Sequence, residues 1–303
     1  MSLLASILHV LLAMAMAPLL LGIINRTKAI FAGRRGQPLL QTYYDLAKLL
    51  RKGGVYSRTT TWVFRAGPVI GLSCAAVALL IVPLGGVGGL VAFPGDILLL
   101  AYMLGMMRFM TVLAAMDTGS AFEGMGASRE VQFSMLTEPA LLLAIAAMAA
   151  NCGSFSLSGI YASPLSTGPA HIPALVLVAA SMLVVLLTEN ARIPVDDPNT
   201  HLELTMIHEV MVLDHGGVDL AMITYGSSLK LWILGSLLVG VAMPLRTGNA
   251  LADLVAAVAA MMALAIVVGV IESVMARLRL VRVPQLLVTA SILSLLAIIW
   301  VLR

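Results

Sequence analysis

Five ionisable residues stand inside or at the edge of long apolar stretches of this sequence, and they are its best candidates for chemistry. They are Arg108, Glu138, Glu189, Lys230 and Glu272. An ionisable side chain among apolar residues is costly unless it is paired or hydrated, so it normally faces the interior of a helix bundle. Desolvated carboxylates can accept and release protons, which makes the glutamates candidates for a proton pathway. The alternative is a static ion pair, in which Arg108 or Lys230 neutralises a carboxylate of another helix.

A further carboxylate, Glu130, precedes Glu138 by eight residues. On an α-helix this spacing separates the two side chains by about 80° around the axis and about 12 Å along it. We expect both to line one wall of a cavity that opens towards the cytoplasm. Pro139 should weaken the helix directly after Glu138 and free a carbonyl oxygen that such a cavity could hydrate.

A polar segment follows Glu189. Its helix-start signal, Asp-Asp-Pro-Asn, begins at Asp196 and predicts an amphipathic helix over residues 198–212, with His201 and His208 on one face. The seven-residue spacing of the two histidines is not that of a helical zinc-ligand pair, in which the ligands are four residues apart. We therefore predict no metal site, and expect interface hydrogen bonding or proton exchange from these residues.

These residues need transmembrane helices to position them. Of the 303 residues, 60% are hydrophobic and only 11% are charged, and the mean hydropathy is +1.03. A soluble domain carries roughly a quarter charged residues. We predict an all-α, polytopic membrane protein that forms a single membrane domain over residues 1–303, with interfacial amphipathic helices on its cytoplasmic side. Eight spans are predicted near residues 3–24, 63–82, 97–116, 133–150, 172–187, 220–243, 251–275 and 286–302.

Four polar loops are predicted on one side of the membrane, at residues 25–62, 117–132, 188–219 and 276–285. Of the 18 Lys and Arg residues, 14 fall on these loops or at their edges. The positive-inside rule places the loops in the cytoplasm and both termini outside, in an inner (cytoplasmic) membrane. One long charged face opposite a short bland one predicts docking of a soluble module.

The first of these loops carries a second predicted interfacial helix, over residues 39–52, where apolar and charged residues interleave after Arg34-Arg35-Gly36. It is either an anchor to anionic membrane lipid or a docking surface for a partner. The two cysteines, Cys74 and Cys152, form no CxxC motif, so the chain cannot hold an iron–sulfur cluster or a thiolate zinc by itself. The net charge of +3 is explained by topology and predicts no nucleic-acid partner.

Three charged runs resemble those of the family of the quinone-chamber membrane subunit of respiratory complex I (NADH-quinone oxidoreductase). They are GRRGQPLLQTYYDLAKLLRK from Gly33, GASREVQFSMLTEP from Gly126 and ENARIPVDDPNTHLEL from Glu189. The resemblance covers nearly the whole chain and is closest to the membrane subunits of group 4 energy-converting NiFe hydrogenases, such as formate hydrogenlyase and hydrogenase-4.

The resemblance implies roles for individual residues. It supports Glu138 and Glu189 and adds Glu203, so that with Glu130 and Glu272, which are predicted from their positions, the proton pathway is Glu130, Glu138, Glu189, Glu203 and Glu272. It places partner docking, or the mouth of a quinone chamber, at Arg34, Arg35, Gly36, Gln41, Asp45, Lys48, Arg129, Arg192 and Asp196, and the polar segment after Glu189 adds Asp197, His201 and His208 to this set. Three departures from the complex I pattern argue against a quinone: His201 replaces a usual carboxylate, Val195 replaces a usual Phe, and Pro284 stands near a usual Asp.

The resemblance also implies partners and a function. The partners would be a hydrogenase-like large subunit, an iron–sulfur small subunit and antiporter-like membrane subunits, with the NiFe centre and the iron–sulfur clusters in those partners and no cofactor in this chain. The chain would be a non-catalytic subunit of an oxidoreductase complex that anchors the module and couples its reaction to proton or ion translocation. The alternatives are a quinone-chamber subunit of complex I, a free-standing ion transporter and a passive anchor.

Overall fold

The computed structural model describes residues 2–162, 171–196, 206–243 and 247–303. These residues contain eight helices that are long and apolar enough to cross a membrane, as the hydropathy predicted. They are α1 (Ser2–Phe31), α3 (Trp62–Ile81), α4 (Asp96–Asp117), α5 (Ala121–Cys152), α7 (Ile172–Glu189), α9 (Gly217–Ala242), α10 (Ala250–Val274) and α11 (Val283–Leu302). Shorter helices lie between them: α2 (Gln41–Leu50), α6 (Leu157–Ala162), α8 (His208–Met211) and the 3₁₀ turn η1 (Leu280–Arg282).

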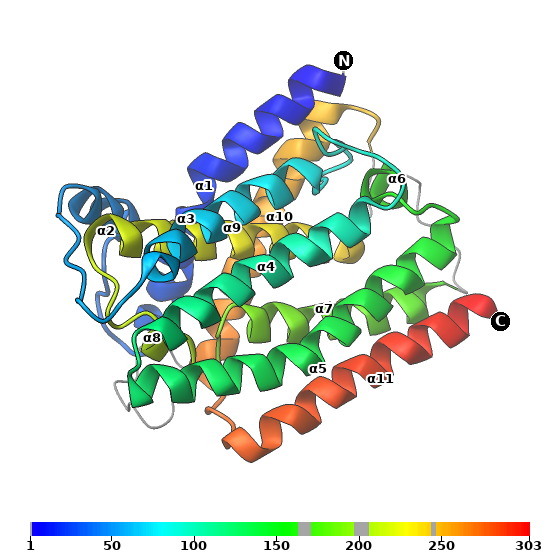
Figure 1. The fold of residues 1–303 in the computed structure, drawn as a ribbon. Helices are drawn as coiled ribbons and strands as arrows, with labels where there is room; N and C mark the ends of the chain where they lie inside the picture. Colours follow the sequence, from blue (N-terminus) through cyan, green and yellow to red (C-terminus); the bar gives the residue numbers. More distant parts are fainter. Residues whose placement is uncertain (1, 163–170, 197–205, 244–246) are drawn as a thin grey trace.

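Helix α9 is the centre of the bundle (Figure 1). Within its apolar window 72% of the residues are buried, and the indole of Trp232 is completely enclosed. Helices α1, α3, α7 and α10 surround α9, and α4 packs against α3. Helices α5, α7 and α11 pack together beside them. A hydrogen-bond chain joins these three helices, because the Ser294 hydroxyl contacts Ser181 Oγ at 2.7 Å and donates to the carbonyl of Ala140 at 3.1 Å.

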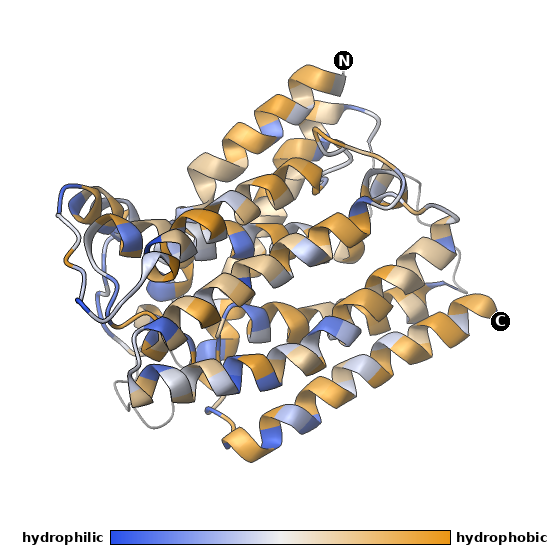
Figure 2. Cartoon of the chain, viewed as in Figure 1, coloured by the Kyte–Doolittle hydropathy of each residue, from blue (hydrophilic) through white to orange (hydrophobic). Residues whose placement is uncertain are grey.

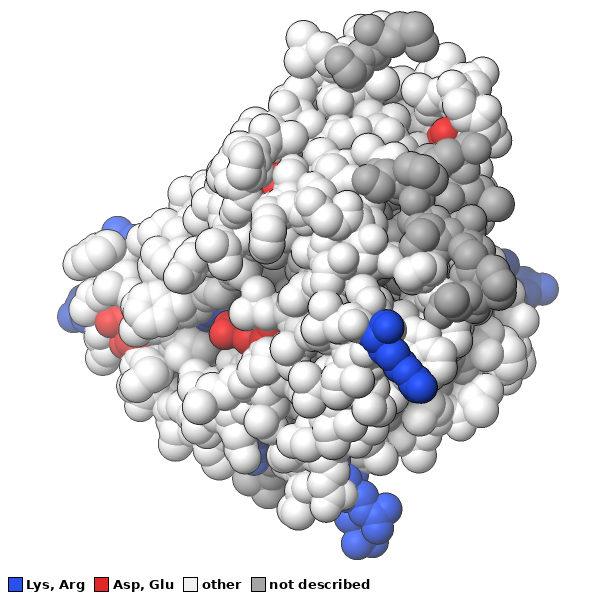
Figure 3. Space-filling model, turned by 90° about the vertical axis from the view of Figure 1, so that its right-hand side faces the viewer, with Lys and Arg blue, Asp and Glu red and all other residues white. Residues whose placement is uncertain are grey.

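Polar residues gather at one end of the molecule, where α2, α8 and the first turns of α5 lie (Figure 2). Both chain ends marked in Figure 1 lie away from that end. The side shown in Figure 3 is mostly uncharged, with basic and acidic atoms at only a few places. The uneven charge distribution along the sequence is therefore also an uneven distribution in space.

Helix α5 differs from its predicted span. We expected residues 117–132 to form a loop and the span to begin near residue 133, but α5 is helical from Ala121. The polar first turns of α5 are stabilised by packing, since Glu123 and Ala127 are buried against the segment around α8. A side chain at Gly126 would come within 2.8 Å of the Ile207 carbonyl oxygen, so glycine permits this close approach. The helix also continues through Pro139.

The two predicted amphipathic helices have different outcomes. Helix α2 forms at Gln41–Leu50, within the predicted segment, and none of its residues is buried. Most of the helix predicted over residues 198–212 lies outside the described residues. In its described part, only His208–Met211 is helical.

Candidate functional site

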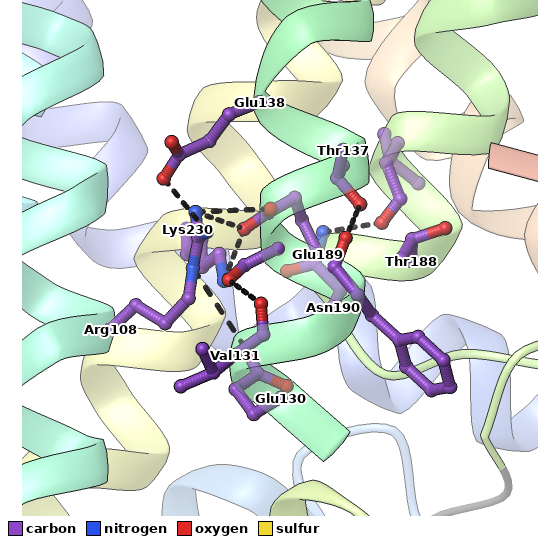
Figure 4. A network of polar contacts seen from close by, with 12 residues as sticks. Arg108, Glu130, Val131, Thr137, Glu138, Thr188, Glu189, Asn190 and Lys230 are labelled. Atoms are coloured by element: carbon purple, nitrogen blue, oxygen red, sulfur yellow. Dashed lines mark hydrogen bonds and ion pairs between the residues drawn. The ribbon is translucent and has the colours of Figure 1, made fainter. Parts of the chain in front are cut away.

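The guanidinium group of Arg108 is the centre of a buried polar network (Figure 4). Arg108 lies in the C-terminal half of α4, and only 8% of its side chain is exposed. Its Nη1 donates to Glu138 Oε1 at 2.9 Å, and its Nη2 lies 3.1 Å from Glu189 Oε1. Its Nε lies 3.9 Å from Glu130 Oε1. One cation therefore contacts carboxylates of two other helices, α5 and α7.

A second cation, Lys230, approaches the same site from α9. Its Nζ lies 2.8 Å from Glu189 Oε2, which also accepts from Arg108 Nη2 at 3.3 Å, so both cations share this oxygen. The network thus joins four helices, α4, α5, α7 and α9. Because it contains three carboxylates and two cations, it carries one excess negative charge when every group is ionised. A network with one unmatched carboxylate can hold or release a proton without losing its remaining ion pairs.

A cavity of about 200 Å³ lies beside this network. Its lining includes the network residues Arg108, Glu130, Glu189 and Lys230, and also Arg192, Asp196, His208 and Glu209. At about 30 Å³ for each water molecule, this volume holds several, and the charged residues among its otherwise largely apolar lining supply hydrogen-bond partners for them. Burial of the imidazole lowers the pKa of His208 from its ordinary 6.5, which favours the neutral form. The cavity can therefore connect the network to the polar end of the protein by water.

A second charge cluster adjoins the cavity through Arg192 and Asp196. The buried carboxylate of Glu272, on α10, is 2.8 Å from Lys28 Nζ and 3.3 Å from Arg192 Nη1. Nearby, Arg277 Nη2 lies 2.8 Å from Asp196 Oδ1, and Asp196 Oδ2 accepts the backbone N–H of Ile207 at 3.0 Å. Since Arg192 and Asp196 line the cavity and also belong to this cluster, the segment 190–196 connects the two sets of charges.

The structure brings together part of the predicted site. Glu130, Glu138 and Glu189 share one network, Glu272 belongs to the second cluster, and Arg192, Asp196 and His208 border the cavity. Arg129 donates to the carbonyl of Met206 at 3.1 Å. The predicted residues Asp197, His201 and Glu203 lie outside the described residues.

The predicted residues of the first loop lie apart from this network, on exposed surface. Arg34, Arg35, Gly36 and Lys48 do not line the cavity. Gln41 donates to Asp45 Oδ1 at 2.9 Å within helix α2. Within the described part of the chain, no group of three His, Cys, Asp or Glu residues is placed to hold a metal ion.

Sequence reasoning singled out Arg108 and Lys230 as ionisable residues of the spans, but it left them out of the predicted proton pathway and gave an ion pair with a carboxylate of another helix as the alternative. The structure shows both residues in such ion pairs, at the centre of the network. A signal was present, because each stands nine or more residues from both ends of its helix. Basic residues so far from a helix end cannot extend to the membrane surface, so they must find carboxylates inside the bundle.

Comparison with known proteins gives the chain a family. The family model for NADH dehydrogenase matches residues 3–302. The chain is 32% identical over 296 residues to formate hydrogenlyase subunit 4 of Escherichia coli (strain K12), covering 94% of each protein. It is 30% identical over 299 residues to hydrogenase-4 component C of the same organism, covering 94% of this chain and 91% of that protein.

A solved structure has the same fold. A chain of the membrane-bound sulfane sulfur reductase, an archaeal respiratory membrane complex, superposes with a TM-score of 0.83 and 21% identity, and 98% of each chain is covered. Each of these comparisons covers almost the whole length of the chain. The chain belongs to the NADH dehydrogenase family of complex I-like membrane subunits.

Proposed function

We propose that this chain is the membrane subunit of an energy-converting NiFe hydrogenase complex, and that it couples the redox reaction of a docked module to the movement of protons or other cations. The names of two relatives, formate hydrogenlyase subunit 4 and hydrogenase-4 component C, support the hydrogenase branch. The observation that carries the coupling role is the network centred on Arg108, which joins carboxylates of two helices beside a cavity that is lined in part by charged side chains.

The coupling mechanism begins at the polar loops. A redox event in the docked module displaces the segment 190–196, whose Arg192 and Asp196 contact Glu272 and Arg277. Because this segment also lines the cavity, its displacement changes the hydration of Glu189 and Glu130. Arg108 and Lys230 then redistribute between three carboxylates. The carboxylate left without a cation takes up a proton and releases it when the cation returns.

We also propose an orientation in the membrane and partner subunits for the chain. The polar loops face the cytoplasm, both termini lie outside, and the complex sits in an inner membrane. A hydrogenase-like large subunit and an iron–sulfur small subunit dock on the polar end, and antiporter-like subunits lie beside the chain in the membrane. The NiFe centre and the iron–sulfur clusters belong to those partners.

The identity of the complex is tested by purification through a tag on this chain in mild detergent. We expect co-purification of the partner subunits, with nickel and with hydrogen evolution. A nickel-free complex that reduces a quinone would assign the chain to complex I. A lone polypeptide that carries an ion flux after reconstitution would make it a transporter.

The coupling role is tested with Glu138→Gln and Glu189→Gln in the complete complex. We expect assembly to remain intact and hydrogen evolution, proton movement into vesicles or both to fall, because an amide cannot exchange a proton. Glu123→Gln is the matched control: Glu123 is another buried glutamate of α5, it lies outside the network, and its Oε1 accepts the backbone N–H of Asp214. Normal turnover with normal pumping in both network variants would refute the coupling role and leave a passive anchor.

A further inference from the structure

The network has an opening on its membrane-facing side. A groove of about 360 Å³ lies between α4 and α5, and Arg108, Glu138 and Glu189 contribute to its lining. Most of its remaining lining is apolar, including Tyr102 and Leu142. This groove is distinct from the cavity at the polar end, although both contact Arg108 and Glu189.

Glu138 is exposed in this groove at the depth of the hydrocarbon. The chain leaves 53% of its side chain uncovered. Glu138 Oε1 lies 3.8 Å from the position of a Cβ added at Gly105, and Gly105 stands nine residues after the start of α4. Nine residues correspond to about 14 Å along a helix, close to the middle of a hydrocarbon layer about 30 Å thick. A carboxylate there cannot remain in contact with lipid tails at low energetic cost.

The walls of the groove suit a helix. Leu98, Tyr102 and Phe109 recur at helical spacing along one face of α4, and all three are exposed, Tyr102 by 72%. At the middle of this face, an added Cβ at Gly105 would meet only Glu138 within 4 Å. Large apolar side chains beside a small residue at mid-membrane are the features that let a second helix approach closely.

The charges of the network indicate which kind of side chain a helix in the groove would carry. Three carboxylates face two cations, and among the described residues the polar contact recorded for Glu138 comes from Arg108 to Oε1. A purely apolar helix over the groove would leave the other oxygen, Oε2, desolvated without a donor. A basic side chain would supply that donor and compensate the excess negative charge of this chain's network, so that a carboxylate would take up a proton only when a cation is displaced from it.

We propose that a transmembrane helix of a neighbouring subunit occupies the groove between α4 and α5 and places a basic side chain against Glu138. This partner deepens the proposed function, because Glu138 belongs to the network that we assign to coupling. The surface itself depends only on the chain spanning a membrane, so it does not require the redox module to be a hydrogenase.

The test is photo-crosslinking of the complete complex in native membranes. A benzophenone amino acid replaces Tyr102, and the adducts are identified by mass spectrometry. We expect one membrane subunit to be captured, at an apolar segment that carries a Lys or Arg within one helical turn of the crosslinked position. A captured segment without a basic residue would overturn the charge assignment, and adducts with lipid alone would overturn the proposal.

A matched pair of variants shows that the groove itself is the docking site. Gly105→Trp fills the groove while leaving all network charges in place, and we expect it to abolish the crosslink. Gly105→Ala adds only a methyl group and should retain the crosslink. Equal crosslinking in both variants would refute docking in the groove. A specific crosslink in a nickel-free complex would overturn the hydrogenase assignment alone, whereas lipid adducts in an active hydrogenase would overturn the docking alone.

Discussion

Replacing Lys230 by Met removes one of the two cations of the network with little change in side-chain length. Its Nζ lies 2.8 Å from Glu189 Oε2, and both side chains are buried. Removing one partner of a buried ion pair typically costs about 3–5 kcal/mol, because the other charge is left uncompensated. Arg108 remains 3.1 Å from Glu189, so we expect a loss at or just below the bottom of this range, about 2–3 kcal/mol.

A loss of this size is measurable by thermal unfolding of the purified complex in detergent. At roughly 2–4 °C for each kcal/mol in a chain of this order of length, Tm should fall by about 4–12 °C. Trp232 is a suitable fluorescence reporter, since it is fully buried two residues from the substituted position.

The double variant Lys230→Met/Glu189→Gln distinguishes the ion pair from a general packing defect. It removes the uncompensated carboxylate together with the lysine, so we expect it to be more stable than Lys230→Met alone. A double-mutant cycle should give a coupling free energy of about 1–3 kcal/mol. If the two single losses add to within about 0.5 kcal/mol, the two side chains do not interact in the folded protein and the network as described is wrong.

Two further predictions concern the polar end. Asp117→Ala should destabilise the start of α3 by about 1 kcal/mol, because Asp117 Oδ2 caps this helix by accepting the backbone N–H groups of Thr61 at 2.6 Å and Phe64 at 3.3 Å. We expect faster limited proteolysis near residue 60. An unchanged cleavage rate would show that Asp117 does not stabilise the start of α3. Burial of the His215 imidazole, which stacks on Phe64, lowers its pKa from the ordinary 6.5, so the unfolded chain binds a proton that the folded chain does not. The stability that is present above about pH 6.5 should therefore be lost as the pH falls below this value. We expect His215→Gln to flatten the dependence of Tm on pH, and an unchanged slope would exclude His215 as the source of that dependence.

The sequence predicted the helices because hydropathy alone determines where a chain can cross a membrane. The relative placement of Glu130 and Glu138 on a helix could also be predicted, since their spacing is a local property, although the predicted span began only near residue 133. The sequence could not predict that Arg108 joins Glu138 to Glu189, because that contact depends on how α4 packs against α5 and α7.

The length of α5 was missed for a related reason. Residues 121–132 are too polar to read as a membrane span, and their helix is stabilised by contacts with α8, which lies about 80 residues later in the chain. Gly126 is needed because the Ile207 carbonyl oxygen lies where a side chain at this position would be, and that contact is not visible in the sequence. Hydropathy reports local transfer free energy and contains no information about such contacts.

The hydrogen bond from Ser294 to the carbonyl of Ala140 holds α5 to α11 just past Pro139 and can serve as a pivot for the helix. The part of α5 from Ala121 to Glu138 extends from this point towards the polar end. Glu130 lies ten residues from the pivot, about 15 Å, so a tilt of this part of α5 by about 5° would carry it about 1.3 Å while hardly moving Glu138. Glu130 Oε1 lies 3.9 Å from Arg108 Nε, so a displacement of this size is enough to form or break the Glu130–Arg108 ion pair while the Glu138–Arg108 contact stays in place.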